Sequence, residues 1–241
     1  PHLVSVKPVG PNPTDATSLQ FAAIFSEPVS GAISSWARNG SFVGSTTELA
    51  RSEFDELLDF TMSSNVGEVA TGITLPNSFT VEFWHRSSTP AIPHRGIFSY
   101  SAGTNDNELT VFTDGRLWLD DNIIGNIGPM VPGKWTHVAV VNDFANGQVI
   151  AYVDGVVALN VATSAIAASG GFLALGQDQD AIGGGYDPNQ AYQGQIDEVR
   201  IWGGVRSSAQ LAADMFNSIN PATANLLHYW RFDGVADLGV G

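Results

Sequence analysis

The chain has 241 residues, 44% of them hydrophobic, and it contains no cysteine. This length and hydrophobic content suit one large domain, or one domain with a small appendage, and they argue against an intrinsically disordered chain. Without cysteine no disulfide can form, so the composition carries no information about the redox compartment. Pro1 in place of an initiator methionine indicates a processed protein or a part of a longer one.

The charge of the chain restricts its partners. The net charge is −14, with 10 lysines and arginines against 24 aspartates and glutamates. Nucleic acid binding needs a basic surface, so no nucleic acid partner is predicted. Anionic membranes are disfavoured for the same reason, and no apolar run reaches the roughly 18 residues of a membrane span. An acidic surface suits a secreted protein in calcium-bearing surroundings, and an extracellular or cell-surface location is predicted.

Residues 1–48 form an appendage with two predicted strands, at residues 3–6 and 19–25, and prolines between them. The phrase FSEPVSG resembles the strand and turn of bacterial immunoglobulin-like repeats. Two strands cannot bury a core alone, so we expect them to pack on the main domain or on a neighbouring chain. They are either a plain edge extension or a strand pair through which copies of the chain self-associate.

Residues 49–59 are acidic and compatible with a helix. Within them, Glu53 and Asp55 resemble the start of the Glu-x-Asp-x-x-Glu strand of laminarinase-type glycosidases. Leu58 stands where the third acid would have to be. Because the acid and nucleophile of such enzymes must both be carboxyl groups, no enzyme activity is predicted.

From Ile73 onward the pattern is that of an all-β protein, with short strands recurring roughly every 10–15 residues between turn residues. One helix is predicted at residues 209–217, with Ser207 or Ser208 as its N-cap. The sequence therefore predicts an antiparallel two-sheet jelly-roll sandwich over residues 49–232, with one short helix, an N-terminal strand appendage and a linker at 233–241. The predicted strands are residues 79–84, 97–100, 109–112, 116–119, 135–141, 148–153, 156–161, 172–175, 196–202 and 225–232.

The segment between the strands at 172–175 and 196–202 is rich in oxygen donors. It contains Asp178, Asp180 and Asp187 but no lysine or arginine. Three aspartates in so short a loop repel one another unless a cation lies between them, and Ca²⁺ takes roughly 6–8 oxygen ligands. The alternative is an acidic, solvated loop. The side-chain amides available in the same segment are those of Gln177, Gln179, Asn189 and Gln190.

The phrase LGQDQDAIGGGYDPNQ resembles the calcium loop of the pentraxins. The resemblance places Asp178 and Asp180 at two carboxylate ligands and Gln179 at a residue that offers its backbone carbonyl. It places Asp187 at the late acidic ligand and Gln190 at the late amide. Aspartate replaces the family's glutamate at positions 178 and 187, which shortens the reach by one methylene and weakens the second calcium site more than the first.

A second phrase, FSYSAGTNDNELTVF, resembles the strand turn that completes the pentraxin site. Asp106 and Asn107 fall on its ligand pair. The resemblance implies a first calcium held by these two residues with the 178–180 segment, and a second held by Asp178, Asp180, Asp187 and Gln190. Phe112 falls where the family's apolar ring backs the ligand, and it equally fits an ordinary strand residue.

Other phrases resemble laminin-G and concanavalin A-like domains, namely SFTVEFWHR, GKWTHVAVV, AYVDG and IDEVRIW. This resemblance covers about residues 55–232. The pentraxin disulfide would join the positions of Glu82 and Ala139, and neither is cysteine. We therefore expect a bacterial relative from a surface or secreted protein.

The resemblance implies a calcium-dependent module that binds a carbohydrate or a ligand carrying phosphate or carboxylate, with one or two Ca²⁺ ions. The alternative is a structural subunit or repeat of a surface filament or adhesin, in which calcium stiffens a joint. Trp118 is left open as a sugar-stacking residue, and Trp36 is expected to be exposed. His137 and four further tryptophans are expected in the interior: Trp84, Trp135, Trp202 and Trp230.

Overall fold

The computed structural model describes residues 3–8, 21–25, 57–60, 69–164 and 168–232. Strands β1 (Leu3–Pro8) and β2 (Phe21–Phe25) pair antiparallel, which confirms the two predicted N-terminal strands. They belong to the first of two compact units into which the chain divides, residues 1–55 and residues 56–241. The predicted boundary at residue 48, Trp36, Glu53, Asp55 and the linker at 233–241 lie outside the described residues.

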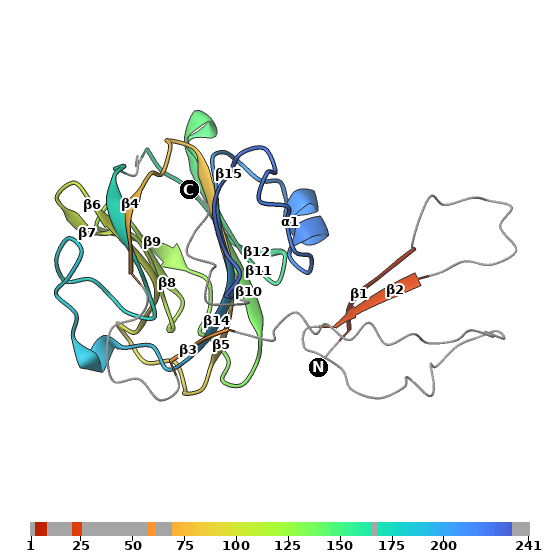
Figure 1. Ribbon diagram of the computed structural model, residues 1–241, viewed down its shortest axis with the longest axis horizontal. Helices are drawn as coiled ribbons and strands as arrows, with labels where there is room; N and C mark the ends of the chain where they lie inside the picture. The colour runs from red at the N-terminus through yellow and green to blue at the C-terminus, as the bar shows by residue number, and fades with distance from the viewer. Residues whose placement is uncertain (1–2, 9–20, 26–56, 61–68, 165–167, 233–241) are drawn as a thin grey trace, which may run out of the picture. The chain divides into compact units, whose positions relative to one another are not determined.

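The larger unit is a sandwich of two antiparallel sheets (Figure 1), as predicted. In the seven-stranded sheet the strand order is β12-β11-β10-β5-β14-β15, with β3 paired to β14; in the six-stranded sheet it is β4-β13-β6-β7-β8-β9. The seven-stranded sheet consists of β3 (Leu58–Asp59), β5 (Phe79–Ser87), β10 (Thr136–Asp143), β11 (Gln148–Val153), β12 (Val156–Ala162), β14 (Gly194–Trp202) and β15 (Leu226–Trp230). The six-stranded sheet consists of β4 (Val69–Ile73), β6 (Gly96–Ala102), β7 (Asn105–Phe112), β8 (Arg116–Leu119), β9 (Asn122–Asn126) and β13 (Gly171–Leu175).

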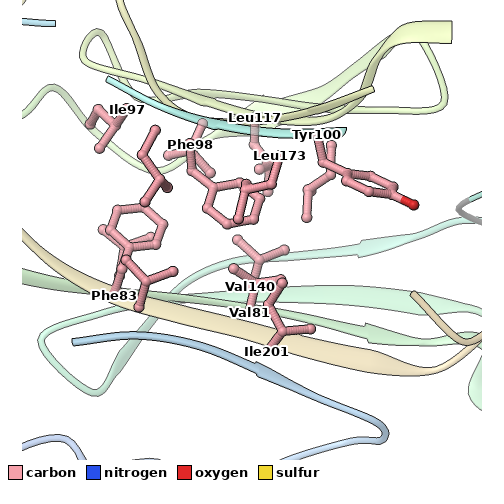
Figure 2. Packing of buried hydrophobic residues seen from close by; sticks show 14 of the residues in the cluster. Val81, Phe83, Ile97, Phe98, Tyr100, Leu117, Val140, Leu173 and Ile201 are labelled. Carbon is pink, nitrogen blue, oxygen red and sulfur yellow. The ribbon is translucent and has the colours of Figure 1, made fainter. Parts of the chain in front are cut away.

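The core lies between the two sheets, where alternate side chains of each strand point inward. The rings of Phe83 and Phe98 stack across it with centroids 5.8 Å apart. The apolar side chains that fill this layer are excluded from water, which supplies most of the stabilisation of such a fold. Figure 2 shows the layer, with Val81, Phe83, Val140 and Ile201 on one side and Phe98, Tyr100, Leu117 and Leu173 on the other.

Helix α1 (Ser208–Asp214) belongs to the outer face of the seven-stranded sheet. Ser207 is its N-cap and forms a capping box with Gln210, so one of the two predicted caps is confirmed. Leu211 packs on side chains of β10 and β11, and Met215 accepts a hydrogen bond from the Trp84 indole through its backbone carbonyl, at 2.7 Å. This helix is too short to cross a membrane, and the described residues contain no helix with the length and apolarity of a membrane span.

Three details differ from the sequence prediction. Leu58 and Asp59 form a strand on β14 instead of continuing a helix, because the β14 edge offers backbone partners there. Helix α1 ends at Asp214 rather than at residue 217. Strands β4 and β9 were not predicted; both contain a glycine and lie at the two edges of their sheet, where the apolar alternation is weak.

A buried polar network ties β5, β10 and β14 together beneath α1. Glu82 and Ala139 are directly opposite each other in the ladder, so the two positions of the family disulfide are neighbours here. The Glu82 carboxylate accepts from the His137 imidazole at 3.1 Å and from the Trp202 indole at 2.7 Å, with the Arg200 guanidinium 3.7 Å away. Burial by itself raises the pKa of Glu82, but these partners lower it to about 2.

Removing the Glu82 carboxylate should destabilise the sandwich strongly. In Glu82→Ala the buried Arg200 loses one of its two carboxylate neighbours and His137 loses its acceptor, so we expect a loss of about 3–5 kcal/mol in the free energy of unfolding. Urea denaturation measures this loss. The matched control is Lys134→Ala, which breaks a partly exposed ion pair with Asp154 and should cost less than about 1 kcal/mol. Equal losses in the two variants would contradict the account.

Candidate calcium and ligand site

The order of strands in the six-stranded sheet brings the two predicted site segments together. Strand β6 lies between β13, which leads into the acidic loop at 176–193, and β7, which begins beside Asp106. The loop leaves β13 next to Gly96, where a side chain would meet the backbone of Asp178 at 2.7 Å. Glycine at position 96 therefore allows Asp178 to lie directly against the start of β6.

The Gln179 side chain fastens the loop to the sheet. Its amide nitrogen donates to the backbone carbonyls of Ser99 and Phe172, at 3.0 and 3.1 Å, and its carbonyl oxygen accepts from the Ser101 hydroxyl at 2.9 Å. The Ser101 hydroxyl also accepts from the backbone of Gly183 at 3.1 Å. Gln179 is completely buried. Its side chain therefore fixes the backbone from Asp178 to Asp180 over the middle of the sheet.

The late part of the loop is held by Gln177 and Asp187. Gln177 donates to the backbone carbonyl of Asp187 at 3.0 Å and accepts from the backbone of Asp178 at 3.0 Å. The Asp187 carboxylate caps the short 3-10 helix η3 (Pro188–Gln190) by accepting from the backbone and side chain of Asn189, both at 2.9 Å. Asp187 and Gln190 thus lie in the same folded loop as Asp178, but one carboxylate oxygen of Asp187 is already engaged.

Strand register and hydrogen bonding place the two segments near each other. Asn105, which precedes Asp106, is paired with Ala102 of β6, and the adjacent Ser101 hydroxyl donates to the Gln179 side chain. Burial, and then the negative charge of Asp180, raise the pKa of Asp178 to about 7, and Asp106 adds to the rise. The backbone amide of Gln179 and the charge of Arg116 act in the opposite direction. Asp178 is only 3% exposed, whereas Asp180 faces solvent. Asp106, Asp178 and Asp180 therefore share one region of strong negative potential.

Two side-chain amide oxygens at this place have no hydrogen-bond partner within the described residues. These are Asn107 Oδ1 and Gln190 Oε1, and both are buried. Buried acceptors without a donor are costly, so each normally has water, an ion or a ligand beside it. Both residues are predicted calcium ligands. Their oxygens, with the carboxylates of Asp106, Asp178 and Asp180, are the donor type that Ca²⁺ prefers, so the residues present fit this ion.

Carboxylates alone do not complete a metal site here. In the part of the chain that the structure describes, no group of three His, Asp or Glu side chains could hold a metal ion by itself. Since Ca²⁺ takes roughly 6–8 ligands, amide and backbone oxygens would have to contribute alongside the carboxylates. A cation between the aspartates would relieve the repulsion among their negative charges.

The structure adds acidic residues that the sequence analysis missed. Asp120 and Asp121 form the turn between β8 and β9, both with positive φ, and Asp121 accepts from the backbone of Asn107 at 3.0 Å. Burial, and less strongly the charge of Asp106, raise the pKa of Asp121. The doubled aspartate before Asn122 was the available signal. Its position beside β7 followed only from the strand order.

Phe112, the predicted ligand-facing residue, is only 1% exposed. Its ring is edge-on to those of His94 and Trp118, with centroids 6.1 and 6.4 Å away, and the Arg116 guanidinium lies 5.2 Å from its centroid. A ligand at this place would therefore meet His94, Arg116 or Trp118 before it met Phe112. The tryptophans predicted in the interior, and His137, are all buried.

The sequence profile described as the concanavalin A-like lectin/glucanases superfamily matches residues 62–212, more than half of the chain. The chain belongs to this superfamily. C-reactive protein 1.4 of Limulus polyphemus is 31% identical over 155 residues, 57% of this chain and 62% of that protein. Neuronal pentraxin-2 of Cavia porcellus is 33% identical over 159 residues, 62% of this chain and 37% of that protein. These relatives confirm the pentraxin resemblance.

Among solved structures, a proposed carbohydrate-binding protein from Bacteroides ovatus superposes on 71% of this lectin-like chain with a TM-score of 0.54. The match covers 51% of that protein at 20% identity, which is a similarity of fold alone. The chain spans less than two thirds of the length of the pentraxin relatives. Its origin from a bacterium stays a prediction.

Substituting Asp178 should stabilise the calcium-free protein in a pH-dependent way. In the folded protein the pKa of Asp178 is about 7, whereas the ordinary pKa of an aspartate is 3.8. The unfolded chain therefore releases this proton at a lower pH than the folded protein does. As a result, the free energy of unfolding falls as the pH rises from about 3.8 to about 7. The Asp178→Asn side chain cannot ionise, so the free energy of unfolding of this variant should be about 1–4 kcal/mol higher than that of the parent at pH 8. Urea denaturation with a chelator present, at pH 8 and pH 5, measures the gain. If the variant is no more stable than the parent at pH 8, or is stabilised equally at both pH values, then ionisation of Asp178 does not destabilise the folded protein and the account is contradicted.

Proposed function

We propose that this chain is a calcium-dependent binding module of an extracellular protein, specific for a carbohydrate or for a ligand that carries phosphate or carboxylate. The observation that supports the proposal is that the turn at 105–107 and the loop at 178–180, far apart in the sequence, contact neighbouring residues of β6, beside the unpartnered oxygen of Asn107. Like charges gathered in this way, with a buried acceptor that lacks a donor, need a cation between them.

The first ion would be held by Asp106, Asn107, Asp178, Asp180 and the backbone carbonyl of Gln179. When bound, Ca²⁺ supplies a Lewis acid that can accept ligand oxygens at an open coordination position. The protein's own contribution is to fix that position. Gln179 anchors the loop, and Asp180 is exposed at its rim, so the open side faces solvent. A second ion, held by Asp178, Asp180, Asp187 and Gln190, would bring the buried Gln190 oxygen into use.

A binding role is preferred to a catalytic one. The superfamily includes both lectins and glucanases, whereas the relatives reported above are pentraxins. The apolar side chain of Leu58 lies in β3 at the position where a glucanase-type acid would be required. We therefore propose no enzymatic activity. Self-association through β1 and β2 stays a prediction.

Calcium binding should depend on the exposed carboxylate of Asp180. Asp180→Ala removes a ligand from the rim of the loop without opening the core, so calcium binding should be lost while the sandwich remains folded. Calorimetry with CaCl₂ on chelator-treated protein tests binding, and circular dichroism tests folding. Asp59→Ala, which removes another exposed aspartate on β3, is the matched control and should bind as the parent does. An Asp180→Ala variant with unchanged affinity would contradict the site.

Ligand binding should require calcium. A glycan array and a set of phosphate esters, probed in calcium and again in a chelator, should give signals that the chelator removes. If calcium binds and raises the unfolding temperature but no ligand is retained, the ion has the purely structural role of a joint in a filament or adhesin. Turnover of any polysaccharide would contradict the non-enzymatic assignment.

A further inference from the structure

Strand β8 places two donor side chains on the outer face of the six-stranded sheet. Arg116 and Trp118 are two residues apart, so they project to the same side of the strand. Both lie against Phe112, the guanidinium carbon at 5.2 Å from its ring centroid and the indole ring at 6.4 Å. Phe112 thus forms an apolar base, with a cation and an indole placed over it.

Both residues have a buried N–H group that is not used. Arg116 Nη2 and Trp118 Nε1 have no acceptor among the described residues. The Nε group of Arg116 donates to Asp114 at 2.7 Å, so one edge of the guanidinium is fixed while the Nη2 group lacks a partner. An unpaired indole donor and an unpaired guanidinium donor on one face of one strand are a costly combination unless a shared acceptor can approach them.

This pair of donors lies beside the proposed calcium site. The Arg116 guanidinium lies 5.2 Å from the Phe112 ring centroid, and Phe112 is paired with Gly96 in the ladder of β6 and β7. A side chain at Gly96 would meet the backbone of Asp178 at 2.7 Å, so Phe112 and Asp178 both lie beside Gly96. The chain has only 10 lysines and arginines against a net charge of −14, so a cation at this position is notable. The Arg116 side chain is 20% exposed and Trp118 is half-buried, so both side chains border solvent and a ligand can approach this face of β8.

We propose that Arg116 and Trp118 form an oxyanion subsite, so that the ligand of this module is a saccharide carrying a carboxylate, sulfate or phosphate group. The inference rests on the proposed function, since the hydroxyl groups of the same sugar would bind the calcium ion. The guanidinium and the indole N–H donate to the oxyanion, and the exposed part of the indole ring packs against the apolar face of the sugar ring. A neutral sugar leaves both donors unpaired and binds more weakly.

Calorimetry at saturating calcium tests the subsite with glucuronic acid, glucose 6-sulfate and glucose 6-phosphate against glucose, and with inorganic phosphate alone. The parent protein should bind at least one of the three acidic sugars about tenfold or more tightly than glucose, and that sugar identifies the oxyanion. Arg116→Gln should reduce the preference to about threefold or less, and Trp118→Phe, which keeps a ring but removes the N–H, should reduce it in part. Arg86→Gln, at an exposed arginine of β5, is the matched control and should keep the full preference.

Calcium affinity separates this subsite from the calcium site. Removing the Arg116 cation should leave calcium affinity unchanged or increase it, because a positive charge near the ion is lost. A full preference for the acidic sugar in both Arg116→Gln and Trp118→Phe would overturn the subsite. So would equal binding of glucose and all three acidic sugars by the parent, or binding of inorganic phosphate as tight as that of the acidic sugar. Absence of calcium or of all sugar binding in the parent would instead overturn the proposed function.

Discussion

Like charges held close together on the outer face of the six-stranded sheet are the constraint on which the site depends. Asp178 is fixed against Gly96 by close backbone contact, while Gln179, pinned to the sheet by three hydrogen bonds, prevents the loop from moving away. Asp106 enters the same region from the start of β7, and Asp180 from the rim of the loop. The fold therefore holds the carboxylates near one another at a cost in stability. A cost of this kind is typical of binding sites, where the missing counter-charge is supplied by the ligand.

The opposite face of the sandwich shows how the same chain treats a buried carboxylate that has no external partner. Glu82 is completely buried, yet its pKa is lowered to about 2, because His137 and Arg200 are packed beside it under α1. Asp178 is almost as deeply buried, and its pKa is raised to about 7 because burial, and then the negative charge of Asp180, disfavour its ionised form. One face is thus neutralised by the protein itself. On the other face the buried carboxylate of Asp178 lies among acids, and this is where we propose that a cation binds.

Much of the fold could be predicted because the local pattern and the tertiary environment agree. The strands at 116–119 and 148–153 were predicted with their observed bounds, and Ser207 was recognised as a helix cap. The proposed calcium ligands could be named only through a resemblance, since residues 106 and 178 have no local relation in the sequence. Strands β4 and β9 were missed because edge strands carry weak patterns. The burial of Phe112 and the two unpaired donors of β8 depend on side-chain packing across strands, which periodicity does not encode.

The central claim is that one cation joins the turn at 106–107 to the loop at 178–180. The most direct measurement is a crystal structure of the calcium-soaked protein, with the ion located by its anomalous scattering. The account predicts an ion about 2.3–2.6 Å from oxygens of Asp106, Asn107, Asp178 and Asp180 together. An ion bound by only one of the two segments, or none at this place at saturating calcium, would contradict it.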